Sequence, residues 1–338
     1  MPKETPPNLL QKSDPRSAKG FGEASQPFVL SKGELSNKFR ILKPEEVEKL
    51  GLTKNKPKSL ERKRETGVSI EQAKEILGED VLGPEAIQVT FGFTPEDTPP
   101  IPFSIEELER AKELNQFLEL RVDRTADGKP LDMNKMHELL QPEFTTGNKG
   151  KILNSYGQDN SWYKNEDFLK DVPRASWVLV SKDVIPNSLS KNFLQQTEVI
   201  ANYLKTDIFS AKGGSASGGK DQEMPEAYKE AIEEFEAKKA SIQAILTSNW
   251  QEAAKQLSEL KINQLTRQLP VETMYDFLMY FKNNGKRLLE SKYTCTYRRD
   301  SGGRLVGFGG SDADGARVYR WAPDIVDVLL GVAFSRSL

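Results

Sequence analysis

The chain has 338 residues, of which 29% are charged and 37% hydrophobic, with a net charge of −2. This length supplies an ample core for one large or two ordinary domains, and the small net charge argues against a general nucleic-acid binder. A single cysteine and a single histidine exclude a disulfide framework and a multi-cysteine or His-rich metal site. We therefore expect no catalytic residues, cofactor or metal site. Neither a membrane span nor a secretory signal is visible, so a cytoplasmic location is the default.

Residues 1–66 are predicted to form a disordered basic arm. They contain 15 Lys and Arg against 9 Asp and Glu, and their apolar residues show no sustained period. The charge is densest from Lys54 to Arg64. This stretch fits either weak contact with an anionic partner or a solvated tether, and the lack of interleaved aromatic residues favours the tether.

A small α/β segment with a Pro-rich spacer is predicted over 67–100. Ser69 has the position of an N-cap for a helix that stops at Gly78. The run 87–91 (IQVTF) alternates apolar and polar residues, which predicts a half-buried strand.

Residues 101–209 are predicted to be the first α+β part of the main domain. Ser104 and Glu107 have capping-box spacing, further helices are expected at 132–140 and after Ser190, and strands at 119–122 and 177–180. His137 lies on the 132–140 helix with no second histidine or cysteine nearby, so we interpret it as a surface or partly packed residue.

The segment 210–224 is rich in Gly and Ser. Gly214 to Lys220 matches the first seven positions of a phosphate-binding loop, but Asp221 stands where a Mg²⁺-binding Ser or Thr is needed. A flexible linker is the favoured interpretation. A nucleotide-binding enzyme is the alternative.

An αα-hairpin is predicted over 225–268. Its first helix has a coiled-coil-like apolar seam, and Asn249 with Glu252 starts the second helix. The seam consists of Tyr228, Ile232, Phe235, Ile242 and Leu246. Such a hairpin either docks on its own chain or serves as an assembly module for a partner, with the oligomeric state open.

The last 46 residues, 293–338, differ in composition from the rest. They contain no Lys, Glu, Gln, Met, Asn or His. Leu330, Val332 and Phe334 alternate with smaller residues, which predicts one closing strand with a single buried face. The pattern is typical of variable side chains displayed over a constant core, and an ordinary β-rich terminus of fixed sequence is the alternative.

Two motifs in 267–338 carry a family resemblance. RQLPVETMYDF (267–277), followed by YTCT, resembles the R-L-P-T-E-A-E-W-E-[YF] helix of the formylglycine-generating-enzyme branch of the C-type-lectin fold, and RW…LGVAFSRS (320–337) resembles its closing strand. The same scaffold is used by variable proteins of diversity-generating retroelements. The resemblance implies a C-type-lectin-like mixed sheet over 269–338. The oxidising members of the fold use a cysteine pair, and a chain with only Cys295 departs from them.

In those variable proteins, errors at adenine turn Asn codons into codons for a set of residues that excludes Lys, Glu, Gln, Met and Trp. The resemblance therefore implies a diversified ligand-binding surface for a protein or a glycan, without calcium. The predicted surface positions are Cys295, Tyr297, Arg298, Gly307, Gly310, Ser311, Ala313, Arg317, Tyr319, Ala322, Ile325, Val328 and Leu329. The predicted scaffold positions are Val306, Val318, Trp321, Leu330, Val332, Phe334 and Arg336. A reactive thiol is the alternative role for Cys295.

Overall fold

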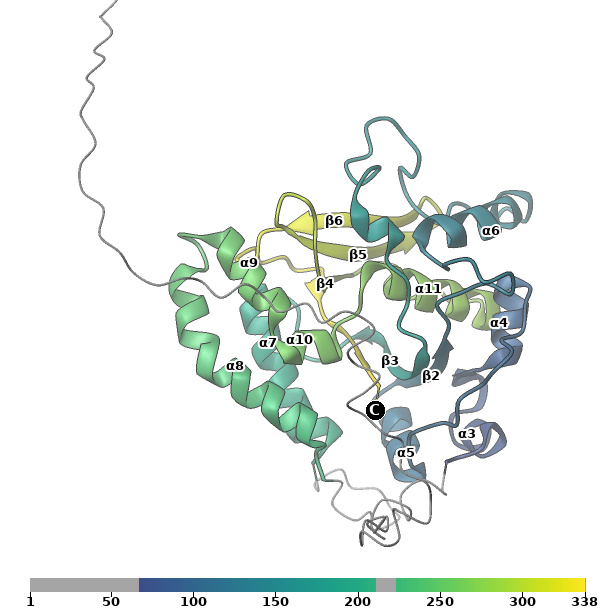
Figure 1. Cartoon of the computed structure of the whole chain (residues 1–338), viewed down its shortest axis with the longest axis horizontal. Coiled ribbons are helices and arrows are strands. Elements are labelled where there is room, and N and C mark those ends of the chain that lie inside the picture. Colours follow the sequence, from purple (N-terminus) through teal and green to yellow (C-terminus); the bar gives the residue numbers. More distant parts are fainter. Residues whose placement is uncertain (1–66, 211–222, 338) are drawn as a thin grey trace, which may run out of the picture. The chain divides into compact units, whose positions relative to one another are not determined.

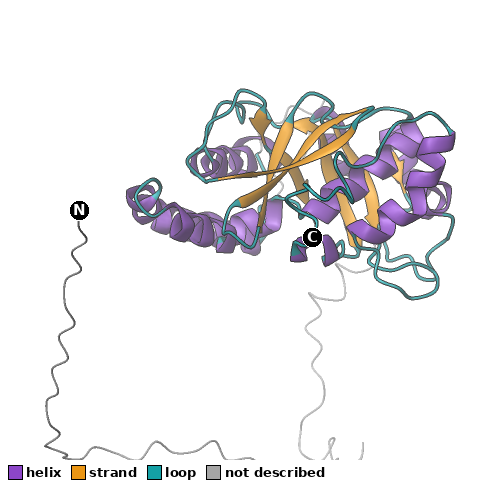
Figure 2. Ribbon diagram, turned by 90° about the horizontal axis from the view of Figure 1, so that it is seen from above, coloured by secondary structure: helices purple, strands orange, loops and turns teal. Residues whose placement is uncertain are grey.

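Two mixed four-stranded sheets and the helices around them make up the part of the chain that the structure describes (Figures 1 and 2). This computed structural model describes residues 67–210 and 223–337, which belong to one unit, Arg62–Leu338. The predicted α+β class is confirmed. The predictions for residues 1–66, with Lys54 to Arg64, and for Gly214 to Lys220 lie outside the described residues.

The elements are labelled as in Figure 1. The helices are α3 (Ile70–Leu77), α4 (Pro84–Phe91), α5 (Ile105–Glu113), α6 (Met133–Thr146), α7 (Phe193–Tyr203), α8 (Glu226–Ile245), α9 (Trp250–Glu259), α10 (Lys261–Thr266) and α11 (Pro270–Asn284). Shorter helical turns are η1 (Gly78–Asp80), η2 (Asp167–Lys170) and η3 (Leu204–Ile208). The strands are β1 (Val81–Leu82), β2 (Gln116–Arg121), β3 (Ser176–Val184), β4 (Tyr293–Arg299), β5 (Leu305–Asp312), β6 (Gly315–Trp321), β7 (Leu330–Gly331) and β8 (Ala333–Arg336).

Local capping signals set the starts of several helices. Ser69 closes a capping box with Gln72 at the start of α3, and Ser104 does the same with Glu107 at α5. Asn249 accepts a hydrogen bond from the Glu252 backbone at the start of α9. The three predicted starts are confirmed.

The strand predicted at 87–91 is wrong, because these residues belong to helix α4. Pro84 opens the helix at its first turn, and Gly92, with φ of 82°, ends it in the left-handed conformation. Ala86, Ile87, Thr90 and Phe91 are buried, which is the spacing of one helical face. The alternation of apolar and polar residues over these five positions therefore predicted the two-residue period of a strand, whereas the buried residues follow the period of a helix.

Helix α7 begins two residues later than predicted. Asn192 is its N-cap and accepts a hydrogen bond from the Gln195 backbone. Ser190 has φ of 56°, and an N-cap needs extended backbone. The cap prediction at Ser190 is therefore wrong.

The chain end links the two sheets. The first sheet has the order β1-β2-β3-β8 and the second the order β6-β5-β4-β7. Strands β7 and β8 are separated by Val332 alone, so the chain passes directly from one sheet to the other. The prediction of one closing strand with a single buried face is therefore wrong. Every residue from Leu330 to Arg336 is buried.

Helix α11 forms the centre of the main core. Its residues from Pro270 to Tyr280 are all buried, and it contacts both β1 and β5. Val306, Phe308 and Val318 of the second sheet belong to the same hydrophobic cluster. The second sheet thus has one face fixed against the core.

The helical hairpin α8–α9 packs on its own chain. All five residues of the predicted seam are buried, in a second cluster that also includes residues of α7 and of the C-terminal strands. Lys261 and Glu230, across α10 and α8, form an ion pair of 3.0 Å. Within the described ranges, no helix has both the length and the apolar character needed to cross a membrane.

Candidate ligand-binding surface

Strand register gives the second sheet two unlike faces. Residues paired across strands share a face, and so do alternate residues along one strand. Val306, Phe308 and Val318 lie on the face toward the core. The opposite face carries Tyr293, Cys295, Leu305, Gly307, Gly309, Arg317, Tyr319 and Trp321.

The helical hairpin covers only part of this second face. Cys295 of β4 and Leu305 of β5 are buried in the cluster that contains Leu257 of α9 and Leu260, and α9 contacts β4. The rest of the face is less covered, since Tyr293 at the start of β4 and Trp321 on the edge strand β6 are half-buried and Tyr319 of β6 is exposed. This open part of the face is therefore the part that can meet a ligand.

Three aromatic rings lie together on the open part of the face. The ring centroids of Tyr293 and Tyr319 are 5.3 Å apart, those of Tyr319 and Trp321 5.4 Å, and those of Tyr293 and Trp321 6.0 Å. These spacings are those of interacting aromatic pairs. The three rings therefore form one continuous aromatic cluster.

An exposed aliphatic loop adjoins the cluster. Ile325, Val326, Val328 and Leu329 have 41%, 55%, 71% and 46% of their surface exposed. The loop follows Trp321 directly and returns beside Tyr293, whose backbone N–H donates to the Leu329 carbonyl at 2.8 Å. We call Tyr293, Tyr319, Trp321, Ile325, Val326, Val328 and Leu329 together the aromatic–aliphatic surface. Of the eight exposed large hydrophobic residues in the described part of the chain, five lie between Tyr319 and Leu329.

The loop backbone is anchored although its side chains are exposed. The Phe193 N–H donates to the Pro323 carbonyl at 3.0 Å, and the Ser190 N–H donates to the Asp327 carbonyl at 3.2 Å. The Asp327 carboxylate accepts from the Leu329 N–H at 2.7 Å. These bonds hold the apolar side chains outward, so less ordering is needed on binding.

The two arginines of β6 beside the surface, Arg317 and Arg320, are already paired. Arg317 donates to the Gly310 carbonyl at 2.7 Å and to Asp312 at 2.9 Å, and the hydrogen bond to Asp312 raises the pKa of Arg317. Arg320 forms an ion pair with Asp300 at 3.4 Å and lies over the Trp162 ring. The arginines beside the aromatic–aliphatic surface are therefore paired, while its loop carries two carboxylates, Asp324 and Asp327, between the apolar side chains.

The structure brings together part of the predicted surface set. Arg317, Tyr319, Ala322, Ile325, Val328 and Leu329 lie on or beside the aromatic–aliphatic surface and are exposed or half-buried. Ala313 is exposed at the turn between β5 and β6. Tyr297 and Arg298 lie at the opposite end of β4, where Arg298 is bound to Asp171 at 2.7 Å. These three residues are not part of the same surface.

Four predicted surface residues are corrected by their burial, namely Cys295, Gly307, Gly310 and Ser311. Cys295 is 3% exposed, because the hairpin covers its part of the sheet, and burial raises the pKa of its thiol to about 12. Cys295 is therefore neither a contact residue nor a reactive thiol. Ser311 is also buried, and its hydroxyl donates to the Leu288 carbonyl.

The scaffold prediction needs one correction as well. Six of its seven residues are buried: Val306, Val318, Leu330, Val332, Phe334 and Arg336. Trp321 is half-buried on the open face and does not anchor the core. Tyr293 and Val326 belong to the surface although sequence reasoning missed them. Tyr293 shares the period-two pattern of Cys295 and Tyr297, which was the available signal.

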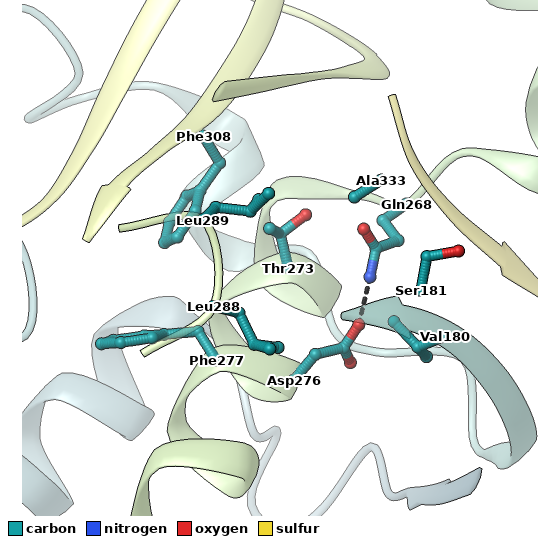
Figure 3. A pocket seen from close by; sticks show the side chains of 10 residues that line it. All are labelled: Val180, Ser181, Gln268, Thr273, Asp276, Phe277, Leu288, Leu289, Phe308 and Ala333. Carbon is teal, nitrogen blue, oxygen red and sulfur yellow. Dashed lines mark hydrogen bonds between the residues drawn. The ribbon is translucent and has the colours of Figure 1, made fainter. Parts of the chain in front are cut away.

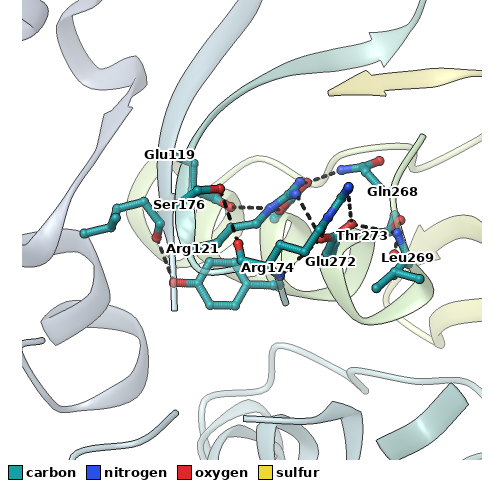
Figure 4. A network of polar contacts seen from close by, with 11 residues as sticks. Glu119, Arg121, Arg174, Ser176, Gln268, Leu269, Glu272 and Thr273 are labelled. Carbon is teal, nitrogen blue, oxygen red and sulfur yellow. Dashed lines mark hydrogen bonds and ion pairs between the residues drawn. The ribbon is translucent and has the colours of Figure 1, made fainter. Parts of the chain in front are cut away.

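The buried polar network in Figure 4 is the strongest alternative candidate for a functional site, because it gathers several charged side chains. Arg121 binds Asp276 through two hydrogen bonds of 2.8 and 2.6 Å, and Arg174 binds Glu272 at 2.7 Å. Glu119 lies beside Arg121, and burial raises the pKa of Glu119 well above its usual value. Glu119, Arg121, Glu272 and Asp276 are at most 2% exposed. A network so enclosed joins α11 to the first sheet and offers no access to a substrate.

Two pockets lie outside the aromatic–aliphatic surface. The internal cavity in Figure 3 measures about 10 Å³, and the Gln268 amide donates to Asp276 at its wall. An open pocket of about 430 Å³ is lined in part by His137 and Tyr156, which stack with ring centroids 3.9 Å apart. His137 is half-buried as predicted, and burial lowers its pKa. Across the described residues, no three His, Cys, Asp or Glu side chains are grouped to hold a metal ion.

Comparison with protein-family models, with curated proteins and with solved structures finds no match to this chain. The resemblance of 267–338 to the variable proteins therefore depends on the residues of that segment alone.

Proposed function

We propose that this protein recognises a protein ligand through the aromatic–aliphatic surface. We also propose that a retroelement diversifies the predicted variable positions on or beside this surface, which are Arg317, Tyr319, Ala322, Ile325, Val328 and Leu329, while Trp321 stays constant. The observation that carries the proposal is the gathering of exposed apolar side chains between Tyr319 and Leu329. This gathering falls within the segment that contains no Lys, Glu, Gln, Met, Asn or His.

A protein ligand fits the surface better than a glycan. Contiguous exposed apolar side chains mark protein–protein contacts, and the centres of such interfaces are rich in Tyr, Trp and Arg and poor in Lys and Glu. Ile325, Val326, Val328 and Leu329 offer no hydrogen bonds from their side chains, whereas recognition of sugar hydroxyls needs polar partners. The aliphatic half of the surface therefore favours protein.

The placement of variable and constant residues supports diversification. The six predicted positions at the surface can all be replaced without entering the core, whereas Val306, Val318 and Phe334 are buried. The segment 267–277 contributes the start of the central helix α11, which comes before β4 in the chain. A constant core under exchangeable side chains is the arrangement that diversification requires.

The assembly alternative has less support. The hairpin would need a free apolar face to capture a partner, but the seam from Tyr228 to Leu246 is buried against the same chain. No described feature adds to this alternative.

The first test is to sequence the DNA on both sides of the gene. We expect a reverse-transcriptase gene and a near-copy of the codons for 293–338 that differs mainly at adenines. The differing codons should include those for Tyr319, Ala322, Ile325, Val328 and Leu329.

The buried scaffold provides the internal control for this test. Codons for Val306, Val318 and Phe334 should be the same in both copies. A complete locus with neither a near-copy nor a reverse transcriptase would overturn diversification. Differences spread equally over buried and exposed codons would overturn it too.

A further inference from the structure

Trp321 lies directly against a glycine of the neighbouring strand. Gly307 pairs with Tyr319 and shares the face of Trp321. A Cβ added at Gly307 would lie 1.8 Å from Cζ3 and 2.6 Å from Cε3 of the Trp321 ring. No side chain fits there unless the indole moves, so the absence of a side chain at 307 allows the present position of Trp321.

The glycines of β5 fall into two kinds. A Cβ at Gly309 would lie 2.1 Å from the Lys292 carbonyl oxygen and 2.7 Å from the Tyr293 Cα, which are backbone atoms of the paired strand. A Cβ at Gly310 would lie 2.5 Å from the Tyr293 hydroxyl, which is the end of a side chain. Gly309 is therefore fixed by the fold, and Gly310, with φ of 55°, has the left-handed backbone that favours glycine. Gly307 alone of the three is limited only by a ring of the aromatic cluster, that of Trp321.

We propose that residue 307 determines the ligand specificity of the aromatic–aliphatic surface by setting the position of Trp321. With glycine, the indole lies against β5 and packs with Tyr319 and Tyr293, which suits an apolar side chain of a protein ligand. With any larger residue, the indole turns away from β5 and the cluster opens. One substitution at 307 thus changes the shape made by all three rings. This proposal rests on the proposed function.

The structural half of the proposal is tested without a ligand. The full chain is labelled with 5-fluorotryptophan, and its four tryptophan ¹⁹F resonances are assigned by single Trp→Phe variants. We expect Gly307→Ser to shift the Trp321 resonance and to raise its exposure to a soluble paramagnetic agent. The resonances of Trp162, Trp177 and Trp250 should not change.

Two glycines serve as matched controls. At Gly302 an added Cβ would only touch Asp300 at 3.4 Å, so Gly302→Ser should leave all four resonances in place. Gly309→Ser should lower the unfolding midpoint, since backbone must move. An unchanged Trp321 resonance in Gly307→Ser, or a loss of stability as large as in Gly309→Ser, would overturn the proposal.

The specificity half is tested with two displayed libraries of the full chain. Both vary Arg317, Tyr319, Ala322, Ile325 and Val328, one with Gly307 and one with Gly307→Ser, and both are selected against lysozyme. We expect binders from each library to lose affinity about tenfold or more when residue 307 is exchanged between Gly and Ser. Binders that keep their affinity would overturn the specificity role. No binders from either library would count against the proposed function and this role with it, while the ¹⁹F result on Trp321 would stand.

Discussion

Replacing Glu119 with glutamine should stabilise the protein at neutral pH, although Glu119 lies in the centre of a charged network. Its two carboxyl oxygens accept no hydrogen bond within the described structure, and the side chain is fully buried. Burial and the neighbouring Asp276 raise the pKa of Glu119 well above its usual value. The carboxyl is therefore neutral over a wide pH range, and glutamine has nearly the same shape and charge.

The sign of the pH dependence follows from this raised pKa. In the unfolded chain Glu119 has a pKa of about 4.3 and loses its proton above that value. The folded state keeps the proton, so the stability from this group is complete below about pH 4 and is lost as pH rises toward the folded-state pKa. Glutamine does not titrate. The stability of Glu119→Gln relative to the wild type should therefore increase by up to about 1.4 kcal/mol per pH unit over this window.

Asp276→Asn is the matched control in the same network. Asp276 binds Arg121 through two hydrogen bonds, and its loss leaves a buried guanidinium short of a partner. Breaking a buried pair in this way costs roughly 3–5 kcal/mol. Urea unfolding followed by circular dichroism at several pH values between about 4 and 8 measures both variants. Parallel pH profiles for Glu119→Gln and the wild type, or an equal cost for the two variants, would refute the reasoning.

Three further predictions concern the surface, the cysteine and the chain end. Tyr319→Ala should change the unfolding free energy by less than about 0.5 kcal/mol. Phe308→Ala, on the core face of the same sheet, should lower the unfolding free energy by about 3–5 kcal/mol. Equal losses for the two variants in urea unfolding would contradict the assignment of one core face and one open face to this sheet. Cys295 should react with a thiol reagent at pH 8 only after unfolding, since burial raises its pKa to about 12, and rapid reaction of the native protein would show that it is accessible. Glu107→Gln should destabilise the folded protein by roughly 3–5 kcal/mol, because Glu107 and Arg336 form a buried ion pair of 2.7 Å. Glu113→Gln is the exposed control, and equal unfolding midpoints for the two variants would be evidence against this prediction.

The features that sequence predicted best are those decided within one turn of helix. The Ser104–Glu107 box forms as expected, because both partners are three residues apart and need no tertiary contact. Where two local signals compete, the hydrophobic pattern alone does not predict which element forms or where it begins. At 84–92, proline and glycine at the two ends outweighed a five-residue alternation. At 190–192, the left-handed backbone of Ser190 moved the cap to Asn192.

The exposure predicted for the surface residues agrees with the structure at Tyr319, where no other element covers the sheet, and fails at Cys295, where one does. Period-two alternation identifies the side chains that share a face, and Tyr319, Arg317 and Trp321 do share one. The alternation cannot tell that α9 covers Cys295, because that contact joins residues about forty positions apart in the sequence. The same limit applies to β7 and β8, where every residue from Leu330 to Arg336 is buried and the apolar side chains pack in the cluster that contains residues of α7 to α10.

The glycines of β5 connect the fold with the proposed variation. A position tolerates diversification only if a new side chain can be accommodated without moving the backbone, because packed interiors accept little change in volume. Gly309 fails this condition at the Lys292 carbonyl, whereas Gly307 meets it through movement of Trp321. Gly310 fails the condition as well, because its φ of 55° lies in the left-handed region that favours glycine. Gly307 is therefore the glycine of β5 at which a change of one residue should alter the binding surface most.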